Sequence, residues 1–445
     1  MKLFNKNRFL YFITTTFILL LIFVPVYIYK TNSVVVKTEK EQPPKEFPLN
    51  YTKEGIQQVV EANNKFGIDL YLELATEKAD KNHFISPFSI SMAMAMLYEM
   101  AKGKTAEEIQ KACSFPDIDV IRPNISYIYR MFDTQFKKEN TTNKSDEKNY
   151  EILLANALWI NKTFPVKENY KNIIKQYYFG LVENLDFSGN PSKSAQTINN
   201  FVEEKTQGTI KDLILPNEID DFTVMVLTNS IYFKGVWLYE FDKQNTRDRE
   251  FKINANKTIN VPFMNFINPE QEFLYIDTPE LEILELPYKE RKISMLIILP
   301  KQGNLEEQEE KILREFPELK QKMQPRSVYL ISIPKFEIET NYLLDAAFKK
   351  LGITSAYSAG ADFSNATDMG IFLDESKHKA YIKVDEKGTV ASAATVLLLK
   401  LGEDIDSPKK INFIADHPFI FIIQDNQTNA ILFLGRIVNP VSNSV

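Results

Sequence analysis

The amino-acid sequence predicts an α+β fold with large, mostly antiparallel sheets, and three observations support this prediction. The 445-residue chain is 44% hydrophobic and 25% charged, a balance that suits a globular protein with a large core. Helical and strand-like segments follow one another without strict alternation. From about residue 51 onward, no internal repeat and no linker rich in Pro, Gly or Ser divides the chain. We therefore expect residues 51–445 to form a single domain.

Capping residues mark the expected helices. Ser86 can cap a helix that begins at Pro87, because Pro suits the first helical position, and Gly103 can end that helix. In TAEEIQKAC, Thr105 and Glu108 have the spacing of a capping box, which predicts the start of a second helix. Further helices that end in Gly are expected over residues 194–208 and 341–352.

The expected strands are runs of 7 to 16 residues rich in β-branched and aromatic side chains. A turn with D-N and N-Q-T chemistry separates the last two of them. In chain order they are YEILLANALWIN, FTVMVLTNSIYFKGVW, KISMLIILP, SVYLISIPKFEIE, HKAYIKV, FIFIIQD and ILFLGRIV.

An uncharged run of 21 residues, 9–29, follows a basic flank of Lys2, Lys6 and Arg8. Its length is about that of a helix that crosses a bilayer, and the basic flank favours export with the N-terminus inside. The segment VPVYIYKTNS offers no A-x-A cleavage site. We predict an uncleaved signal anchor that holds the folded domain on the extracellular face of a bacterial-type cytoplasmic membrane. Cleavage would give a secreted protein instead, and a buried core helix is a third reading.

These features divide the chain into three expected parts. Residues 1–30 form the signal anchor or transmembrane segment. Residues 31–50, with EQPPKEFP in the middle, form a polar tether with polyproline character. Residues 51–445 form the folded domain.

Charge and reactive residues argue against several classes of function. The net charge of −6 leaves no basic surface for nucleic acid. The single cysteine, Cys113, excludes an internal disulfide and a multi-cysteine metal site. The three histidines, His83, His378 and His417, lie neither beside a G-x-S-x-G motif nor within H-E-x-x-H. We expect a monomer that is not an enzyme and has no catalytic residue, metal or cofactor.

Residues 389–401, TVASAATVLLLKL, form an uninterrupted strand-forming stretch between two acidic turns. The first half consists of Ala, Ser, Thr and Val, which are too small to fill a core, and larger residues follow. A permanent central strand does not explain this gradient from small to large side chains.

This stretch resembles the reactive-centre loop of a serpin, and residues 51–445 as a whole resemble that family. The segments ISPFSISMAMAML, LTNSIYFKGVW, VDEKGT, ADHPFIFII and ILFLGRIVNP look like serpin signatures in the family's order and spacing. The resemblance implies three β-sheets, eight or nine helices and an exposed reactive-centre loop.

The resemblance also implies a function, that of a suicide-type inhibitor of serine, sometimes cysteine, proteases. Its partner would be the target protease, held as a covalent acyl-enzyme while the cleaved loop enters the main sheet as a new strand. The alternative is a non-inhibitory relative that acts as a binding protein or chaperone. Such relatives commonly carry a charged or bulky first inward residue, or Pro in the hinge, and this hinge has neither.

Alternation along a strand separates the loop residues into two sets. After the hinge residues Glu386 and Gly388, the set expected to face the core is small and uncharged at its start. The counting implied by the family places the cut at Gly402–Glu403, with Leu401 or Lys400 before the cut as alternatives. The inward set is Thr389, Ala391, Ala393, Thr395, Leu397 and Leu399.

Other positions match serpin residues that control opening of the main sheet. Ser89, Asn229 and His378 match residues that form hydrogen bonds beneath its centre. Lys335 matches the partner of Glu386 at the top of the sheet, and Trp237 matches an aromatic residue there. Ordinary core packing is the alternative reading for each of them.

Overall fold

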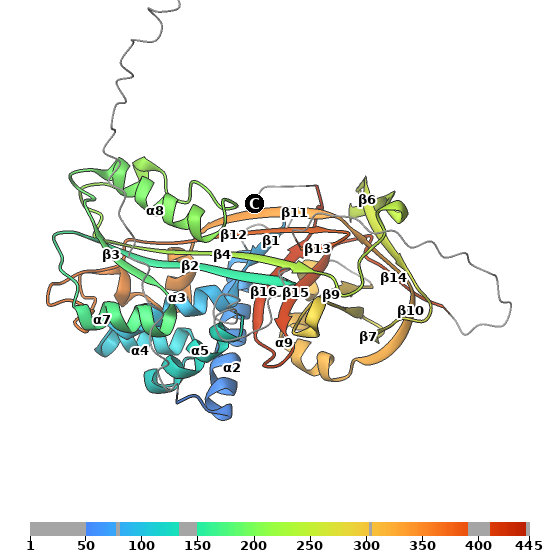
Figure 1. The fold of residues 1–445 in the computed structure, drawn as a ribbon, viewed down its shortest axis with the longest axis horizontal. Coiled ribbons are helices and arrows are strands. Elements are labelled where there is room, and N and C mark those ends of the chain that lie inside the picture. The colour runs from blue at the N-terminus through green and yellow to red at the C-terminus, as the bar shows by residue number, and fades with distance from the viewer. Residues whose placement is uncertain (1–49, 77–80, 133–148, 302–304, 390–409, 442–445) are drawn as a thin grey trace, which may run out of the picture. The chain divides into compact units, whose positions relative to one another are not determined.

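The structure is a computed structural model, and its sheets and helices are drawn in Figure 1. Its described residues belong to one compact unit, Pro48–Val445. Among them, no helix is both long and apolar enough to cross a membrane, and the run 9–29 lies outside them. The structure describes residues 50–76, 81–132, 149–301, 305–389 and 410–441.

A six-stranded sheet forms the upper layer in the view of Figure 1. Its order is β11-β12-β13-β4-β2-β3, and β4 and β2 pair antiparallel along almost their whole length. The strands are β2 (Tyr150–Asn161), β3 (Leu181–Leu185), β4 (Met225–Val236), β11 (Phe336–Leu343), β12 (Glu375–Asp385) and β13 (Gly388–Thr389).

A ten-stranded sheet forms the second layer and has two parts that share β10. The first residues of β10 pair with β7, whereas its last residues pair with β6 and β14. With the six-stranded sheet, these two parts make the three sheets that were expected. The strands are β1 (His83–Ile85), β5 (Arg247–Asn254), β6 (Lys257–Ile267), β7 (Glu272–Asp277), β8 (Leu281–Pro287), β9 (Ile293–Pro300), β10 (Gln324–Pro334), β14 (Ile411–Ile414), β15 (Phe419–Asp425) and β16 (Ile431–Ile437).

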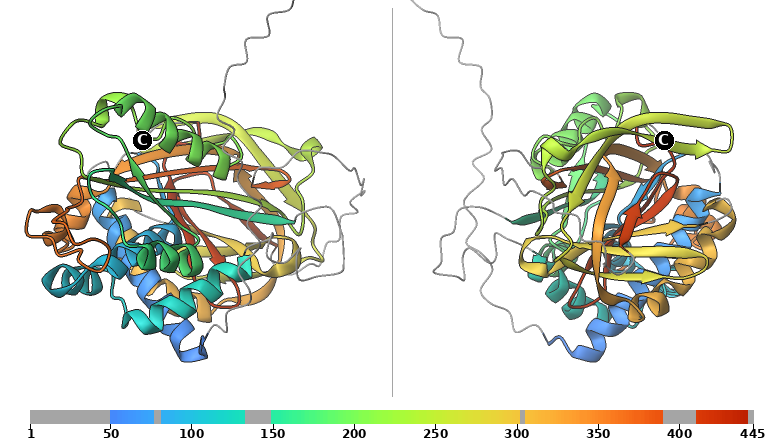
Figure 2. Two further views of the ribbon diagram at one scale, coloured as in Figure 1. Left: turned by 60° about the vertical axis from the view of Figure 1, so that its left-hand side comes forward. Right: turned by 90° about the vertical axis from the view of Figure 1, so that its right-hand side faces the viewer.

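Eight α-helices lie within the described residues, in agreement with the expected eight or nine. Most of them cover the inner side of the six-stranded sheet, whereas α8 lies on its outer face (Figure 2). The helices are α2 (Lys53–Ala75), α3 (Pro87–Met100), α4 (Gly103–Ala112), α5 (Ile118–Phe132), α7 (Glu168–Ile173), α8 (Pro191–Lys205), α9 (Leu305–Gln321) and α10 (Asp345–Lys350).

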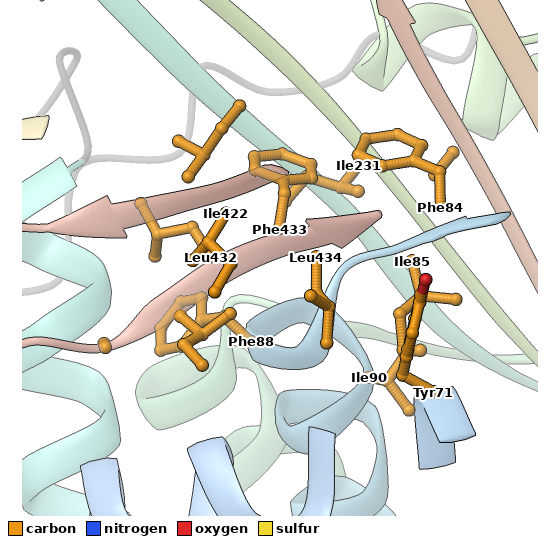
Figure 3. Close-up of a cluster of buried hydrophobic side chains, with 14 of the residues drawn as sticks. Tyr71, Phe84, Ile85, Phe88, Ile90, Ile231, Ile422, Leu432, Phe433 and Leu434 are labelled. Atoms are coloured by element: carbon orange, nitrogen blue, oxygen red, sulfur yellow. The ribbon is translucent and has the colours of Figure 1, made fainter. Parts of the chain in front are cut away.

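The main core lies between the two sheets and around α3 (Figure 3). Phe84 of β1 packs its ring against Phe421 and Phe433, with centroids 5.6 and 5.5 Å apart. Helix α3 is apolar on nearly all sides, so it is buried on nearly all sides. Ser86 caps it as predicted, with its side chain accepting a hydrogen bond from the backbone N–H of Ser89. This cap fixes where Ser89 meets the sheet.

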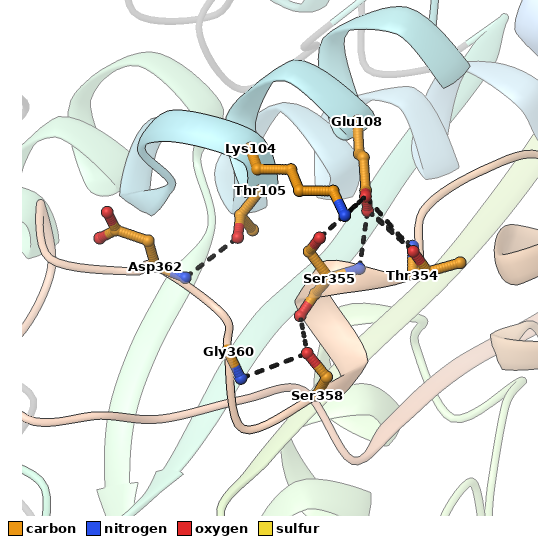
Figure 4. Close-up of polar contacts among 8 residues, drawn as sticks. All are labelled: Lys104, Thr105, Glu108, Thr354, Ser355, Ser358, Gly360 and Asp362. Atoms are coloured by element: carbon orange, nitrogen blue, oxygen red, sulfur yellow. Dashed lines mark hydrogen bonds and ion pairs between the residues drawn. The ribbon is translucent and has the colours of Figure 1, made fainter.

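The predicted capping box at Thr105 and Glu108 is wrong (Figure 4). Helix α3 ends at Met100, and α4 begins at Gly103, which has a positive φ of 50°, so Gly103 starts the second helix and does not end the first, and Thr105 lies inside α4. The Glu108 carboxylate instead accepts hydrogen bonds from the backbone N–H groups of Thr354 and Ser355, at 2.8 and 2.6 Å. Glu108 thereby joins α4 to the segment that precedes β12.

The helix expected over residues 341–352 is also partly wrong. Its first residues extend β11 to Leu343, and only Asp345–Lys350 are helical. Tyr342 pairs with His378 of β12, so pairing across the sheet overrides the local helical preference. The helix expected over 194–208 is α8, which begins at Pro191 behind an Asn190 cap and ends at Lys205.

Candidate functional site

The hinge residues Gly388 and Thr389 lie inside the six-stranded sheet as strand β13. They pair on one side with Asp385 and Val384 of β12, and on the other side with β4. A Cβ atom on Gly388 would lie 1.9 Å from the carbonyl oxygen of Gly235. The φ angle of Gly388 is 152°. Only glycine fits here without displacing β4. The sequence therefore permits a strand to start between β12 and β4.

Thr389 is fully buried and faces the core. Its hydroxyl shares a hydrogen bond of 2.8 Å with the Tyr288 hydroxyl. Burial raises the pKa of Tyr288, so the phenol stays protonated and available for this bond. The Tyr288 ring stacks on Trp237, with centroids 4.5 Å apart and an interplanar angle of 11°. Trp237 donates its indole N–H to the carbonyl oxygen of Asp385, which fixes the stack beneath the hinge.

An ion pair braces the turn between β12 and β13. Lys335 places its Nζ 3.1 and 2.9 Å from the two carboxylate oxygens of Glu386, and Thr246 donates its hydroxyl to one of them. Burial raises the pKa of Glu386, but the hydrogen bonds from Lys335 and Thr246 more than reverse this effect and leave the pKa lowered. The carboxylate is therefore ionised at neutral pH and holds the hinge turn in place.

A buried polar cluster lies beneath the middle of the sheet, where α3 meets β4 and β12. Asn229 of β4 donates to the backbone carbonyl of Ser89 at 2.8 Å and to its hydroxyl at 2.6 Å. His378 of β12 accepts a hydrogen bond of 3.2 Å from the Ser86 N–H at Nε2, so its proton is on Nδ1. That Nδ1 donates to the side-chain oxygen of Asn229 at 2.5 Å. The cluster thus connects both strands of the closed sheet to one buried helix.

Below the hinge, β12 and β4 pair directly with each other. The pairing is parallel and runs from Glu375 opposite Val226 to Tyr381 opposite Tyr232. We call this line of contact the seam. Because β13 already separates the two strands at the top, the seam is where a longer strand would continue between them.

Comparison with known proteins places this geometry in a family. The family model described as "Serpin (serine protease inhibitor)" matches residues 61–440. The chain belongs to the serpin family.

Relatives of this serpin occur in distant organisms. It is 37% identical over 386 residues to an uncharacterized serpin-like protein of Methanosarcina acetivorans, covering 86% of this chain and 88% of that protein. It is 34% identical over 392 residues to human serpin B4, covering 85% and 99% of the two chains.

Solved structures share the fold. Serpin48 of the insect Tenebrio molitor has a TM-score of 0.75 at 30% identity, covering 86% of this chain and 98% of that chain. Human thyroxine-binding globulin, solved with thyroxine, has a TM-score of 0.76 at 30% identity, covering 87% and 100%.

The sequence-predicted site residues fall into three groups in this serpin. Glu386, Gly388, Thr389, Lys335 and Trp237 meet at the top of the sheet, as described above. Ser89, Asn229 and His378 meet at its centre. The remaining loop residues lie outside the described residues: Ala391, Ala393, Thr395, Leu397, Leu399, Lys400, Leu401, Gly402 and Glu403.

Sequence reasoning missed two contributors to the site. Asn156 of β2 lies opposite Asn229 and contacts it from the neighbouring strand. Its signal is visible in LLANALW, because a lone Asn inside an apolar strand must find a partner. Tyr288 gives no such signal, since LPYKE reads as an ordinary turn. Within the described ranges, no cluster of three His, Cys, Asp or Glu residues could hold a metal ion.

Proposed function

We propose that this serpin inhibits serine proteases by trapping their acyl-enzyme. The observation that carries the proposal is the buried strand β13, which begins insertion between β12 and β4 before any cleavage. Thr389 faces the core, so alternation sends Ala391, Ala393 and Thr395 to the same side, where small uncharged residues can pass into the sheet. Cysteine proteases are the second target class in this proposal.

The proposed chemistry belongs to the protease. Its serine oxygen attacks the carbonyl carbon before the scissile bond, an ester forms and the new amine leaves on the C-terminal fragment. Hydrolysis of the ester by water would complete turnover. The serpin prevents this step when its freed loop enters the seam and carries the ester and its protease away, distorting the protease active site. No nucleophile of the serpin is required.

The scissile bond is proposed at Gly402–Glu403, with cleavage after Leu401 or Lys400 as the alternatives. Leu401 would favour chymotrypsin-, elastase- or subtilisin-like proteases, whereas Lys400 would favour trypsin-like ones. Incubation of the purified chain with one protease of each class tests both the function and the bond. An SDS-resistant complex is expected with at least one protease, and mass spectrometry of the released C-terminal peptide identifies the bond.

A binding protein or chaperone is the second candidate function. The similarity to thyroxine-binding globulin, a structure solved with thyroxine, shows that a chain of this fold can bind a small molecule. Complete cleavage of the loop by every protease, without a stable complex, would favour this second function over inhibition.

We also propose that the domain is displayed outside the cytoplasmic membrane by the apolar run 9–29. The 21 uncharged residues and their basic flank support this proposal. Fractionation of expressing cells tests it. Full-length protein in the cytosol would contradict display, and a shortened form in the medium would indicate cleavage and secretion.

A further inference from the structure

The segment that joins α8 to β4, residues 206–224, crosses the outer face of the sheet. Its apolar side chains pack in one cluster with α8, β2 and β4. Most of the strand residues in this cluster belong to β2 and β4, so the segment packs mainly on the β4 side of the seam, although Tyr381 of β12 also packs against it. The members of this cluster from the segment are Ile210, Leu213, Ile214 and Ile219, and their partners in the strands include Ala155, Ala157 and Val226.

One ion pair and one hydrogen bond connect this segment to β12, on the opposite side of the seam, and the hydrogen bond runs from the Lys379 Nζ to the backbone carbonyl oxygen of Lys211 at 2.7 Å. Lys377 of β12 points outward, yet only 7% of its side chain is exposed, and its Nζ lies 2.5 Å from a carboxylate oxygen of Glu218. The same Glu218 oxygen accepts the backbone N–H of Leu215 at 2.7 Å, which holds the carboxylate on the segment. A second carboxylate, Glu375, lies 3.9 Å from the Lys377 Nζ. We call the Lys377–Glu218 pair the latch.

Burial raises the pKa of Glu218, but hydrogen bonds from Lys377 and from the Leu215 N–H outweigh it and lower the pKa overall. The carboxylate is thus charged at neutral pH. A charge-assisted hydrogen bond shielded from water on the lysine side is stronger than an exposed surface pair. The latch therefore opposes separation of β12 from the segment.

Insertion of a strand would pull the latch apart. At the level of the latch, Lys377 of β12 lies opposite Thr228 of β4. Extending the register of β13 along the seam would place Val396 opposite Lys377, between the two strands. Adding one strand moves its neighbours apart by about 4.8 Å. A contact of 2.5 Å across the seam cannot survive this movement while the segment stays packed on β4.

We infer that the Lys377–Glu218 latch contributes to keeping the seam closed and slows the entry of the loop into it. Lys377 and Glu218 are positioning residues, since they act on the seam and touch neither the protease nor the scissile bond. The role in trapping rests on the proposed function, whereas the latch itself can be tested without a protease. Breaking the latch should accelerate insertion by at least about ten-fold, the low end of the range that corresponds to one hydrogen bond to a charged group.

The test measures the uptake of a fluorescent synthetic peptide, TVASAATVLLLK, by the full-length purified chain. Its sequence is that of residues 389–400, so it can fill the seam as a strand. Lys377→Met keeps the length of the side chain and removes the charge, and Glu218, with 31% of its side chain exposed, can then be solvated. Lys377→Met and Glu218→Gln should both take up the peptide faster, and Lys377→Arg should retain the parental rate.

The matched control is Lys383→Met on the same strand. Lys383 also points outward and pairs with Glu337 at 2.8 Å, but Glu337 lies on β11, on the same side of the seam. Removing this pair should leave the uptake rate unchanged, even where it lowers the thermal midpoint. Parental uptake by a folded Lys377→Met variant, or equal acceleration by Lys383→Met, would overturn the inference.

The outcomes also separate the latch from the proposed function. A chain that takes up the peptide, responds to Lys377→Met and forms no complex with any protease would support the latch and contradict inhibition. A parent that forms protease complexes but whose uptake does not respond to Lys377→Met would support inhibition and contradict the latch.

Discussion

Acidification should weaken the centre of the six-stranded sheet through His378. The Nε2 atom of this histidine accepts the Ser86 N–H, so a second proton would have to face a hydrogen-bond donor. Burial lowers the pKa of His378 to about 3, with its contact to Asn229 acting in the opposite direction. In the unfolded chain the pKa returns to about 6.5. The folded state therefore favours the neutral ring.

The sign and size of the effect follow from these two pKa values. Below about pH 6.5, His378 binds a proton in the unfolded chain but stays neutral in the folded chain. The free energy of unfolding therefore falls as the pH falls. Each pH unit in this range costs about 1.4 kcal/mol, or about 2 kcal/mol between pH 6.5 and 5. The contribution is fully present above pH 6.5, and its loss levels off below about pH 3.

Denaturant unfolding of the parent and of His378→Gln at several pH values measures this difference. Glutamine cannot gain a proton, but the variant keeps every carboxylate of the parent. Subtracting the variant's pH dependence of the free energy of unfolding from that of the parent therefore cancels the contributions of the carboxylates. The subtraction also removes His417, whose pKa is raised beside Asp416 despite its burial and whose contribution is lost as the pH rises. The parent should lose about 2 kcal/mol more than the variant between pH 6.5 and 5. Equal pH dependence in both proteins would refute the reasoning.

Three further predictions concern the hinge, the loop and the Glu108 contact. Thr389→Arg would bury a guanidinium against Tyr288, at a cost of several kcal/mol, so under the proposed function it should make the chain a protease substrate and no longer an inhibitor, whereas Val390→Glu should not. The number of inhibitor molecules consumed per protease measures this, and parental efficiency of Thr389→Arg would contradict the alternation. Nicking the loop between residues 399 and 406 should raise the thermal midpoint by tens of degrees, given roughly 2 to 4 °C per kcal/mol. An unchanged midpoint would argue against insertion. Burial raises the pKa of Glu108, but hydrogen bonds from Ser355 and Thr354 lower it to about 2, so its contribution is present above about pH 4.5 and lost as the pH falls through 2. Glu108→Gln should therefore cost about 1 kcal/mol at pH 6, after allowance for solvent screening, and much less near pH 2. If Glu108→Gln lowers the free energy of unfolding equally at both pH values, the loss comes from altered packing or hydrogen-bond geometry and not from the charge of Glu108.

The sequence predicted those parts of the fold in which a local pattern determines the outcome. The apolar runs of β2, β4, β9 and β15 became buried strands, and Ser86 capped α3. The prediction for Glu108 was wrong because its partners, Thr354 and Ser355, lie 246 and 247 positions away in the chain. Tertiary packing determines whether a carboxylate caps its own helix or accepts hydrogen bonds from a distant segment, and residue spacing within the helix cannot predict this.

The same distinction applies to the site. Asn229 and His378 could be assigned to the centre of the sheet through the resemblance to serpins. There the His378 Nδ1 lies 2.5 Å from the side-chain oxygen of Asn229. Tyr288 could not be assigned to the site from the sequence. Its hydrogen bond to Thr389 depends on the position of its ring, which is set by stacking on Trp237 beneath the hinge. The latch was missed for a similar reason. Lys377 and Glu218 lie on segments far apart in the sequence, and each alone reads as an ordinary surface charge.

Strand β13 has a kinetic consequence for any longer strand that grows from it. The unfavourable part of forming a strand is nucleation, because the first pairs fix backbone angles before many contacts repay the loss of entropy. In this molecule Gly388 and Thr389 already hold their places between β12 and β4, and Gly388 fits there without a side chain to displace. Extension of β13 therefore needs no nucleation step, because each further residue forms its strand pairing next to residues that are already paired. The slow step moves away from the hinge and down the seam.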